Sequence, residues 1–136
     1  MSSATFIQGC VCEEPDCGNS PSFFFNIIND ASGKDFIFDL KNSIDQIEVY
    51  AGSKQLDIVQ SKDFYASSTI EFLVVYLNPA KSIYTFVIAN DTIPVSIEFS
   101  GTEDKCCPGL FYEMGKVTRD SFELESDSDG IYLIRI

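Results

Sequence analysis

Apolar and polar side chains alternate along most of this chain in short runs, a pattern typical of β-strands rather than helices. The clearest alternation lies in residues 92–100, where polar positions separate four apolar ones: Ile93, Val95, Ile97 and Phe99. Pro94 has no backbone N–H to donate to a sheet ladder. We therefore expect this strand to lie at a sheet edge, or to contain a bulge, at Pro94.

Other segments rich in β-branched and aromatic residues, bounded by turn formers, predict further strands. We expect these at 21–28, 35–40, 44–50, 69–77, 82–89, 110–119, 122–125 and 131–136. A shorter apolar run, 56–59, follows a turn at 52–54. Residues 61–68 and 101–109 lack the pattern, so we expect loops there.

Two segments say more about the topology. Residues 69–77 are apolar on both faces, which indicates a central strand, although periodicity alone does not separate this from a buried helix. Residues 126–130 end in Asp129-Gly130, a strong turn signal that we expect to join the last two strands.

Short strands with frequent turns and without an amphipathic helix predict an all-β protein. The fold that we expect is a single antiparallel β-sandwich, immunoglobulin-like or prealbumin-like, of about eight or nine strands. The 136 residues fit one domain. We assign 21–136 to the sandwich and 1–20 to a leader remnant and an acidic, Cys-containing tether.

The net charge of the chain limits the kinds of partner that it can bind. The net charge is −12, from 21 acidic and 9 basic residues. A surface this negative disfavours binding to nucleic acid and adsorption to anionic lipid, and its ordinary role is solubility. The longest apolar run, 72–77, has the length of a strand, so we expect no membrane-spanning helix.

The cysteines indicate an oxidising compartment. The chain has five Cys and no His, which excludes a Cys–His nucleophile pair. Cys10, Cys12 and Cys17 lack the paired spacing of a zinc site, and Cys106 and Cys107 are adjacent. Disulfides fit better, but an odd number leaves one cysteine for another role.

The segment Ile7-Gln8-Gly9-Cys10 resembles the end of a bacterial lipoprotein signal, in which the cysteine is acylated. Glu13, Glu14 and Asp16 resemble the surface-export signal of Bacteroidota lipoproteins. The chain as a whole is similar to small Bacteroidota lipoproteins of uncharacterised activity. The resemblance implies an exported protein, lipid-anchored through Cys10 at the outer membrane or cell surface. A basic and apolar leader is then expected upstream of Met1. The alternative is an acidic tail with an ordinary cysteine.

Lipidation of Cys10 would leave Cys12, Cys17, Cys106 and Cys107 for two disulfides, with three connectivities. Adjacent cysteines on extended backbone point to opposite sides, so a Cys106–Cys107 bond is unfavourable. We expect Cys17 to join Cys106 or Cys107, which would stabilise the fold by about 4 kcal/mol in the loop-entropy model. The alternative is reduced thiols in a cytosolic protein, and intact mass under non-reducing conditions distinguishes the two.

Residues 125–130 resemble the opening of a calcium loop, with Asp127 and Asp129 at alternate positions. The twelfth position of such a loop falls on Ile136, which cannot bind calcium. We therefore expect a polar turn. Asn29, Asp30 and Asp35 form a weaker option of the same kind. We expect no metal and no cofactor.

We expect no enzymatic activity, since the chain has neither a Gly-x-Ser-x-Gly nucleophile motif nor a phosphate-binding glycine loop. The main hypothesis is a surface binding module for a protein or a glycan. Five tyrosines are candidates for glycan contact or for packing: Tyr50, Tyr65, Tyr84, Tyr112 and Tyr132. The alternative is a structural envelope protein that self-associates through a sheet edge.

Overall fold

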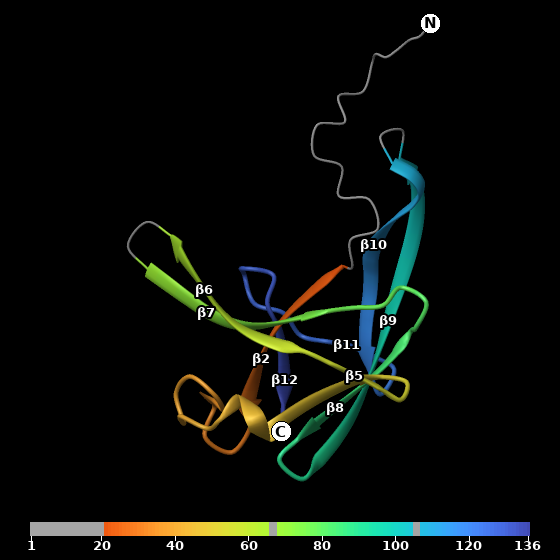
Figure 1. Cartoon of the computed structure of the whole chain (residues 1–136). Helices are drawn as coiled ribbons and strands as arrows, with labels where there is room; N and C mark the ends of the chain where they lie inside the picture. Colours follow the sequence, from red (N-terminus) through yellow and green to blue (C-terminus); the bar gives the residue numbers. More distant parts are fainter. Residues whose placement is uncertain (1–20, 66–67, 105–106) are drawn as a thin grey trace, which may run out of the picture.

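The computed structural model describes residues 21–65, 68–104 and 107–136 (Figure 1). Two β-sheets pack on one another, which confirms the predicted all-β sandwich. The predicted leader remnant and tether, residues 1–20, lie outside the described residues. In the described part of the chain, no helix is long and apolar enough to cross a bilayer.

The strands divide into a five-stranded and a six-stranded sheet. The five-stranded sheet has the order β12-β2-β7-β6, with β3 also paired to β2: β2 (Ser22–Asn29), β3 (Lys34–Asp35), β6 (Ile58–Tyr65), β7 (Ser68–Tyr76) and β12 (Tyr132–Arg135). The six-stranded sheet has the order β11-β10-β9-β8-β4-β5: β4 (Ile47–Ala51), β5 (Lys54–Leu56), β8 (Ile83–Ile88), β9 (Asp91–Asp104), β10 (Cys107–Arg119) and β11 (Phe122–Glu123). A 3-10 turn, η2 (Ile44–Gln46), precedes β4.

One strand pair, formed by the first and last described strands, differs from the purely antiparallel sandwich that the sequence predicts. β12 runs parallel to β2, with Tyr132 opposite Phe25 and Ile134 opposite Ile27, whereas the other strand pairs are antiparallel. The predicted turn at 126–130 is present, closed by the N–H of Asp127 donating to the carbonyl of Ile131 at 2.9 Å. It joins β11 of one sheet to β12 of the other, so it crosses between the layers.

Aromatic side chains hold the two sheets together. Phe23 and Phe25 on β2 are fully buried, and Phe86 on β8 meets both rings edge-on, with centroids 5.8 and 5.2 Å away. Tyr132 stacks on Phe23 at 5.1 Å. Burial of one such ring contributes about 1.5–3 kcal/mol. The alternation predicted for 92–100 is confirmed, since Ile93, Val95 and Ile97 on β9 are buried in the same core.

Two predictions about individual strands can be checked directly. Residues 69–77 form the inner strand β7, between β2 and β6, and not a helix. Pro94 pairs with Thr85 of β8, and the register of β10 on the other side of β9 ends at Ser96. Pro94 is therefore at a local edge of an otherwise inner strand.

The predicted strand at 35–40 is wrong beyond Asp35. The buried carboxylate of Asp35 accepts hydrogen bonds from the N–H groups of Ile37 and Phe38, both at 2.9 Å, and turns the chain. Phe36 and Ile37 still fill the core, which explains the strand-like composition. Similarly, Ile44–Gln46 form the 3-10 turn because the Ser43 hydroxyl accepts from the N–H of Asp45.

The predicted loops at 61–68 and 101–109 are also wrong. β6 continues to Tyr65, β9 continues to Asp104 and β10 begins at Cys107. These segments are the outer parts of two long hairpins that point in different directions (Figure 1). Because the hairpins extend past the core, their side chains do not need the apolar alternation that marks a buried strand.

Asn26 marks the point where β2 and β7 separate. Their register ends at Phe25 opposite Leu73, and the Asn26 side-chain N–H then donates to the Glu71 carbonyl at 3.1 Å. Beyond this point β2 pairs with β3. The Asn26 Oδ1 atom is buried without a partner among the described residues, which costs about 1–3 kcal/mol.

Asp35 should make stability depend on pH. Burial raises its pKa, and the nearby carboxylates of Asp39 and Glu71 add to this, against the two backbone hydrogen bonds that lower it. Because the folded-state pKa is above 3.8, stability should rise as pH falls through the folded value towards 3.8. Asp35→Asn keeps an acceptor for both N–H groups, so it should be at least as stable as the wild type at pH 7. Its stability should not rise at low pH, because the amide does not titrate.

Asp35→Ala is the matched control. It leaves two N–H groups without their acceptor, and we expect it to lower the free energy of unfolding by about 1–3 kcal/mol at any pH. Urea titrations of the three proteins between pH 4 and 7 measure both effects. Equal loss in the Asn and Ala variants at pH 7 would contradict the assignment.

Candidate interaction surface

The outer face of the five-stranded sheet, which points away from the six-stranded sheet, is apolar. Phe24, Val74 and Val59 lie side by side on β2, β7 and β6. The exposed fractions of Phe24, Val59 and Tyr76 are 40%, 48% and 55%. We call the following six residues the apolar face: Phe24, Val59, Phe72, Val74, Tyr76 and Ile131.

The middle of the apolar face is packed as a small second core. Phe72, Val74 and Ile131 are 3–6% exposed although they lie outside the sandwich core. The ring of Phe24 meets that of Phe72 edge-on, with centroids 5.2 Å apart. The packed centre and the exposed Phe24, Val59 and Tyr76 form one continuous apolar area across three strands.

The outer face of the six-stranded sheet is different. Its outward positions include Glu48, Thr85 and Glu98, as expected of a sheet with one face in water. Tyr50 on this face donates its hydroxyl to Glu48 at 2.9 Å, and this hydrogen bond raises the pKa of Tyr50. Ile83 is 52% exposed there. The five-stranded sheet therefore departs from the usual pattern, and such patches mark interaction sites.

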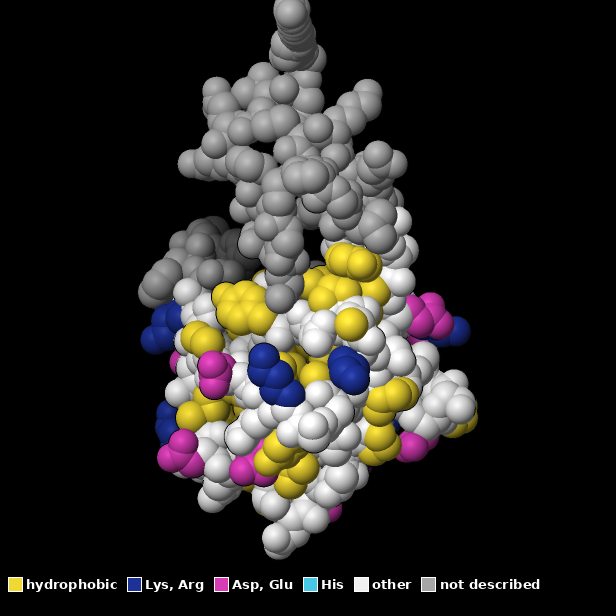
Figure 2. Space-filling view, turned by 45° about the vertical axis from the view of Figure 1, so that its right-hand side comes forward, with side chains coloured by type: hydrophobic (Ala, Val, Ile, Leu, Met, Phe, Trp, Pro, Cys, Tyr) yellow, Lys and Arg dark blue, Asp and Glu magenta, His cyan; other side chains and the backbone are white. Residues whose placement is uncertain are grey.

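Charged residues lie at the margins of the apolar face. None of its six residues is charged, in a chain of net charge −12. Exposed Asp57 lies immediately before β6, two residues from Val59, and exposed Asp129 lies in the turn that leads to Ile131. Figure 2 shows one side of the molecule, where hydrophobic side chains reach the surface in several places, with Lys or Arg side chains between them and most acidic ones nearer the outline.

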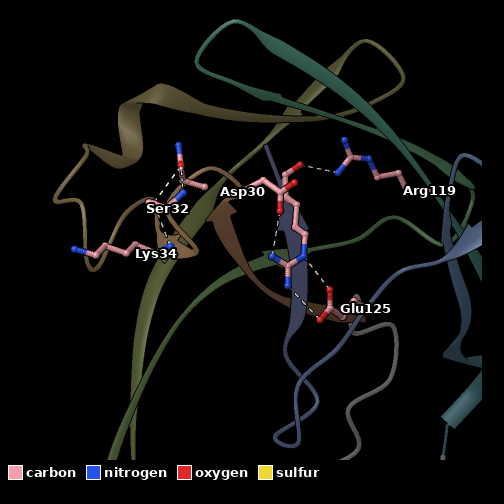
Figure 3. A network of polar contacts seen from close by, with 7 residues as sticks. Asp30, Ser32, Lys34, Arg119 and Glu125 are labelled. Atoms are coloured by element: carbon pink, nitrogen blue, oxygen red, sulfur yellow. Dashed lines mark hydrogen bonds and ion pairs between the residues drawn. The ribbon is translucent and has the colours of Figure 1, made fainter.

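Arg135 on β12 takes part in a polar network with Asp30, Arg119 and Glu125, which are labelled in Figure 3. Its guanidinium contacts Glu125 at 3.0 Å and Asp30 at 3.4 Å, and the Arg119 guanidinium donates to its carbonyl at 2.8 Å. The hydrogen bond from Arg135 lowers the pKa of Glu125. These are exposed, solvent-screened contacts. They link β12 to Asp30 after β2 and to Glu125 before the last turn.

Three shallow clefts lie at the sides of the sandwich. The cleft of about 350 Å³ between β10–β11 and β12 has Lys116, Glu123, Ser126 and Tyr132 among its lining residues. The other two lie beside η2. One, of about 190 Å³, is between η2 and the residues of β5 and β6, and the other, of about 350 Å³, is next to Val87. All three are open to solvent, and the first two are lined mainly by polar surface.

The structure places the five candidate tyrosines in different surroundings. Tyr84 is fully buried, with its hydroxyl hydrogen-bonded to the backbone of Asn78, and Tyr132 packs on Phe23. Tyr112 is 39% exposed on β10, and Tyr65 ends β6. Tyr84 and Tyr132 are therefore explained by packing, as the alternative interpretation of these tyrosines predicts. Tyr76, absent from the sequence-based candidates, is the tyrosine on the apolar face.

The residues of the two calcium alternatives have other roles. The Asp127 carboxylate accepts from the N–H groups of Asp129 and Ile131, at 2.8 and 3.1 Å. Asn29 accepts from Ser32, and Asp30 contacts Arg135. Within the described ranges, no three Cys, Asp or Glu side chains are grouped to hold a metal ion.

Four of the five predicted cysteine sites, Cys10, Cys12, Cys17 and Cys106, lie outside the described residues. Cys107 is the first residue of β10, where its backbone is opposite that of Asp104. The lipidation of Cys10 and the disulfides therefore stay predictions.

Comparison with protein-family models, with curated proteins and with solved structures found no match to this chain.

We predict that the exposed residues of the apolar face are not needed for folding. Val59→Ser and Tyr76→Ser should each change the free energy of unfolding by less than about 1 kcal/mol, as for most exposed positions. Phe23→Ala, one residue from Phe24 but in the core, should cost about 3–5 kcal/mol. Urea denaturation measures all three. Comparable losses for Val59→Ser and Phe23→Ala would show that the apolar face is structural.

Proposed function

We propose that this protein is a non-enzymatic recognition module that binds a protein partner through the apolar face. The observation that carries the proposal is the contrast between the two outer sheet faces. One carries charged and polar side chains beside the exposed Ile83, while the other exposes Phe24, Val59 and Tyr76 around a packed apolar centre. Removing such an area from water on binding favours association by about 25 cal/mol per Å² before the entropic costs.

The chemistry of the apolar face favours a protein over a glycan. Sugar hydroxyls need hydrogen-bond partners when water is displaced. The polar side chains directly opposite its residues are two serines, Ser22 opposite Tyr76 and Ser61 opposite Phe72, and the unpaired acceptor of nearby Asn26 is buried, so the face offers few groups to bind a sugar. A partner with aliphatic or aromatic side chains loses no hydrogen bonds there.

The alternative of self-association through a sheet edge has less support. β5, β11 and β12 are edge strands of two to four residues. β6 is longer, but it carries Lys62 in its middle, and a charged residue on an edge strand discourages pairing with another strand.

We extend the proposal to location through the lipoprotein resemblance: the protein is exported and anchored through Cys10. The described chain begins beside the apolar face, since the N–H of Leu77 donates to the carbonyl of Pro21 at 2.8 Å and Ser22 lies opposite Tyr76. A tether of residues 11–20 would then join the domain at one end of this face.

Selection from a displayed random-peptide library on the immobilised full chain tests the function. We expect enriched peptides to be apolar and to lose affinity by about tenfold or more, about 1.4 kcal/mol, for the double variant Val59→Ser with Tyr76→Ser. Ile83→Ser, an equally exposed apolar residue on the other sheet, is the control and should bind as the wild type does.

A glycan array on the same proteins completes the experiment. Peptides that bind the double variant as well as the wild type would contradict the proposed surface. Glycan binding without any peptide binding would replace the protein partner with a sugar.

A further inference from the structure

The charges around the apolar face restrict the chemistry of its partner, an inference that rests on the proposed function. Asp57 is next to β6 on one side, and Asp127 and Asp129 are in the turn before Ile131 on the other. Arg135 has the outward register of β12, but its guanidinium already contacts Glu125 and Asp30. The margin is therefore acidic on two opposite sides of an uncharged centre.

We propose that the partner presents an apolar stripe flanked by Lys and Arg side chains. Complementary charges at the margin of an interface select partners and speed their encounter. A partner with an acidic margin would be repelled on both sides. The apolar centre supplies the affinity and the margin supplies the selectivity.

A second copy of this chain does not fit this requirement. In a symmetric dimer the same surface of both subunits meets. The acidic margin of one copy, with Asp57 and Asp129, would then face the acidic margin of the other. The two chains would also repel each other, since each has a net charge of −12. The charge pattern thus points to a different, cationic partner.

The dimensions of the apolar face suit an amphipathic helix. The exposed Phe24 and Val59 lie on either side of β7, about 10 Å apart at about 4.8 Å between neighbouring strands. The exposed Tyr76 lies two residues along β7 from Val74, about 7 Å further. A helix about 10 Å wide covers this area in about two turns.

Two synthetic helical peptides of about 18 residues, roughly 27 Å long, provide the probe. Both carry the same leucine stripe, flanked by Lys in one and by Glu in the other. Fluorescence anisotropy with the full chain should show the Lys peptide binding about tenfold tighter or more. The difference should shrink between about 0.01 and 0.1 M salt, as the Debye length falls from about 30 to about 10 Å.

Matched variants separate the margin from the net charge. Asp57→Asn with Asp129→Asn should weaken binding of the Lys peptide by about twofold to thirtyfold, because each of the two exposed ion pairs is worth about 0.2–1 kcal/mol. Glu98→Gln with Glu113→Gln removes the same charge from the six-stranded sheet and should have no effect. Val59→Ser with Tyr76→Ser should abolish the binding of both peptides.

The outcomes distinguish the two proposals. Equal binding of both peptides, lost in Val59→Ser with Tyr76→Ser, would refute the cationic partner and leave the recognition surface intact. Binding of neither peptide, or Lys-peptide binding that persists in that double variant, would refute both.

Two further outcomes would identify another occupant and overturn the proposal. One is a dimer of the full chain in sedimentation velocity that dissociates in Val59→Ser with Tyr76→Ser. The other is tighter binding of the Lys peptide after Phe6→Asp with Ile7→Asp, which would assign the face to the segment before Pro21.

Discussion

The contact of Phe86 with Phe23 and Phe25 is the interaction on which the remaining structure depends. It joins β8 of one sheet to β2 of the other, and all three rings are fully buried. β2 also pairs with β7, β3 and β12, so its position sets that of most of the five-stranded sheet. Because side chains alternate along a strand, fixing Phe23 and Phe25 inward forces Phe24 outward. This is why Phe24 lies on the apolar face.

The same constraint explains why the apolar face is not part of the fold's main core. The sandwich is closed on its inner side by a core that includes residues of both sheets. On the outer side, Phe72 and Val74 are covered by their own neighbours and by Ile131, while Phe24, Val59 and Tyr76 stay exposed. Exposed apolar side chains contribute little to stability and increase the risk of aggregation. The proposed binding role would account for their presence, and the acidic margin would then make the surface selective for a cationic partner.

Strands that lie in the core could be predicted from the sequence, because burial on one face imposes alternation, as in residues 92–100. The predictions failed at two kinds of place. At Asp35 a local turn, in which the carboxylate accepts the N–H groups of Ile37 and Phe38, replaces the strand, and the apolar residues that follow concealed it because they fill the core. The parallel pairing of β12 depends on which sheet the chain enters after Gly130. For 69–77 the sequence showed two apolar faces but not what covers each, so Tyr76 was missed.

The central claim is that the outer face of the five-stranded sheet is open to solvent and to a partner. Paramagnetic relaxation enhancement by a soluble gadolinium chelate, read on methyl signals of the full chain, tests it most directly. The account predicts that Val59 broadens as readily as Ile83, which is 52% exposed, while fully buried Val75 on the same sheet does not. Protection of Val59 equal to that of Val75 would show that the face is already covered, and would contradict the account.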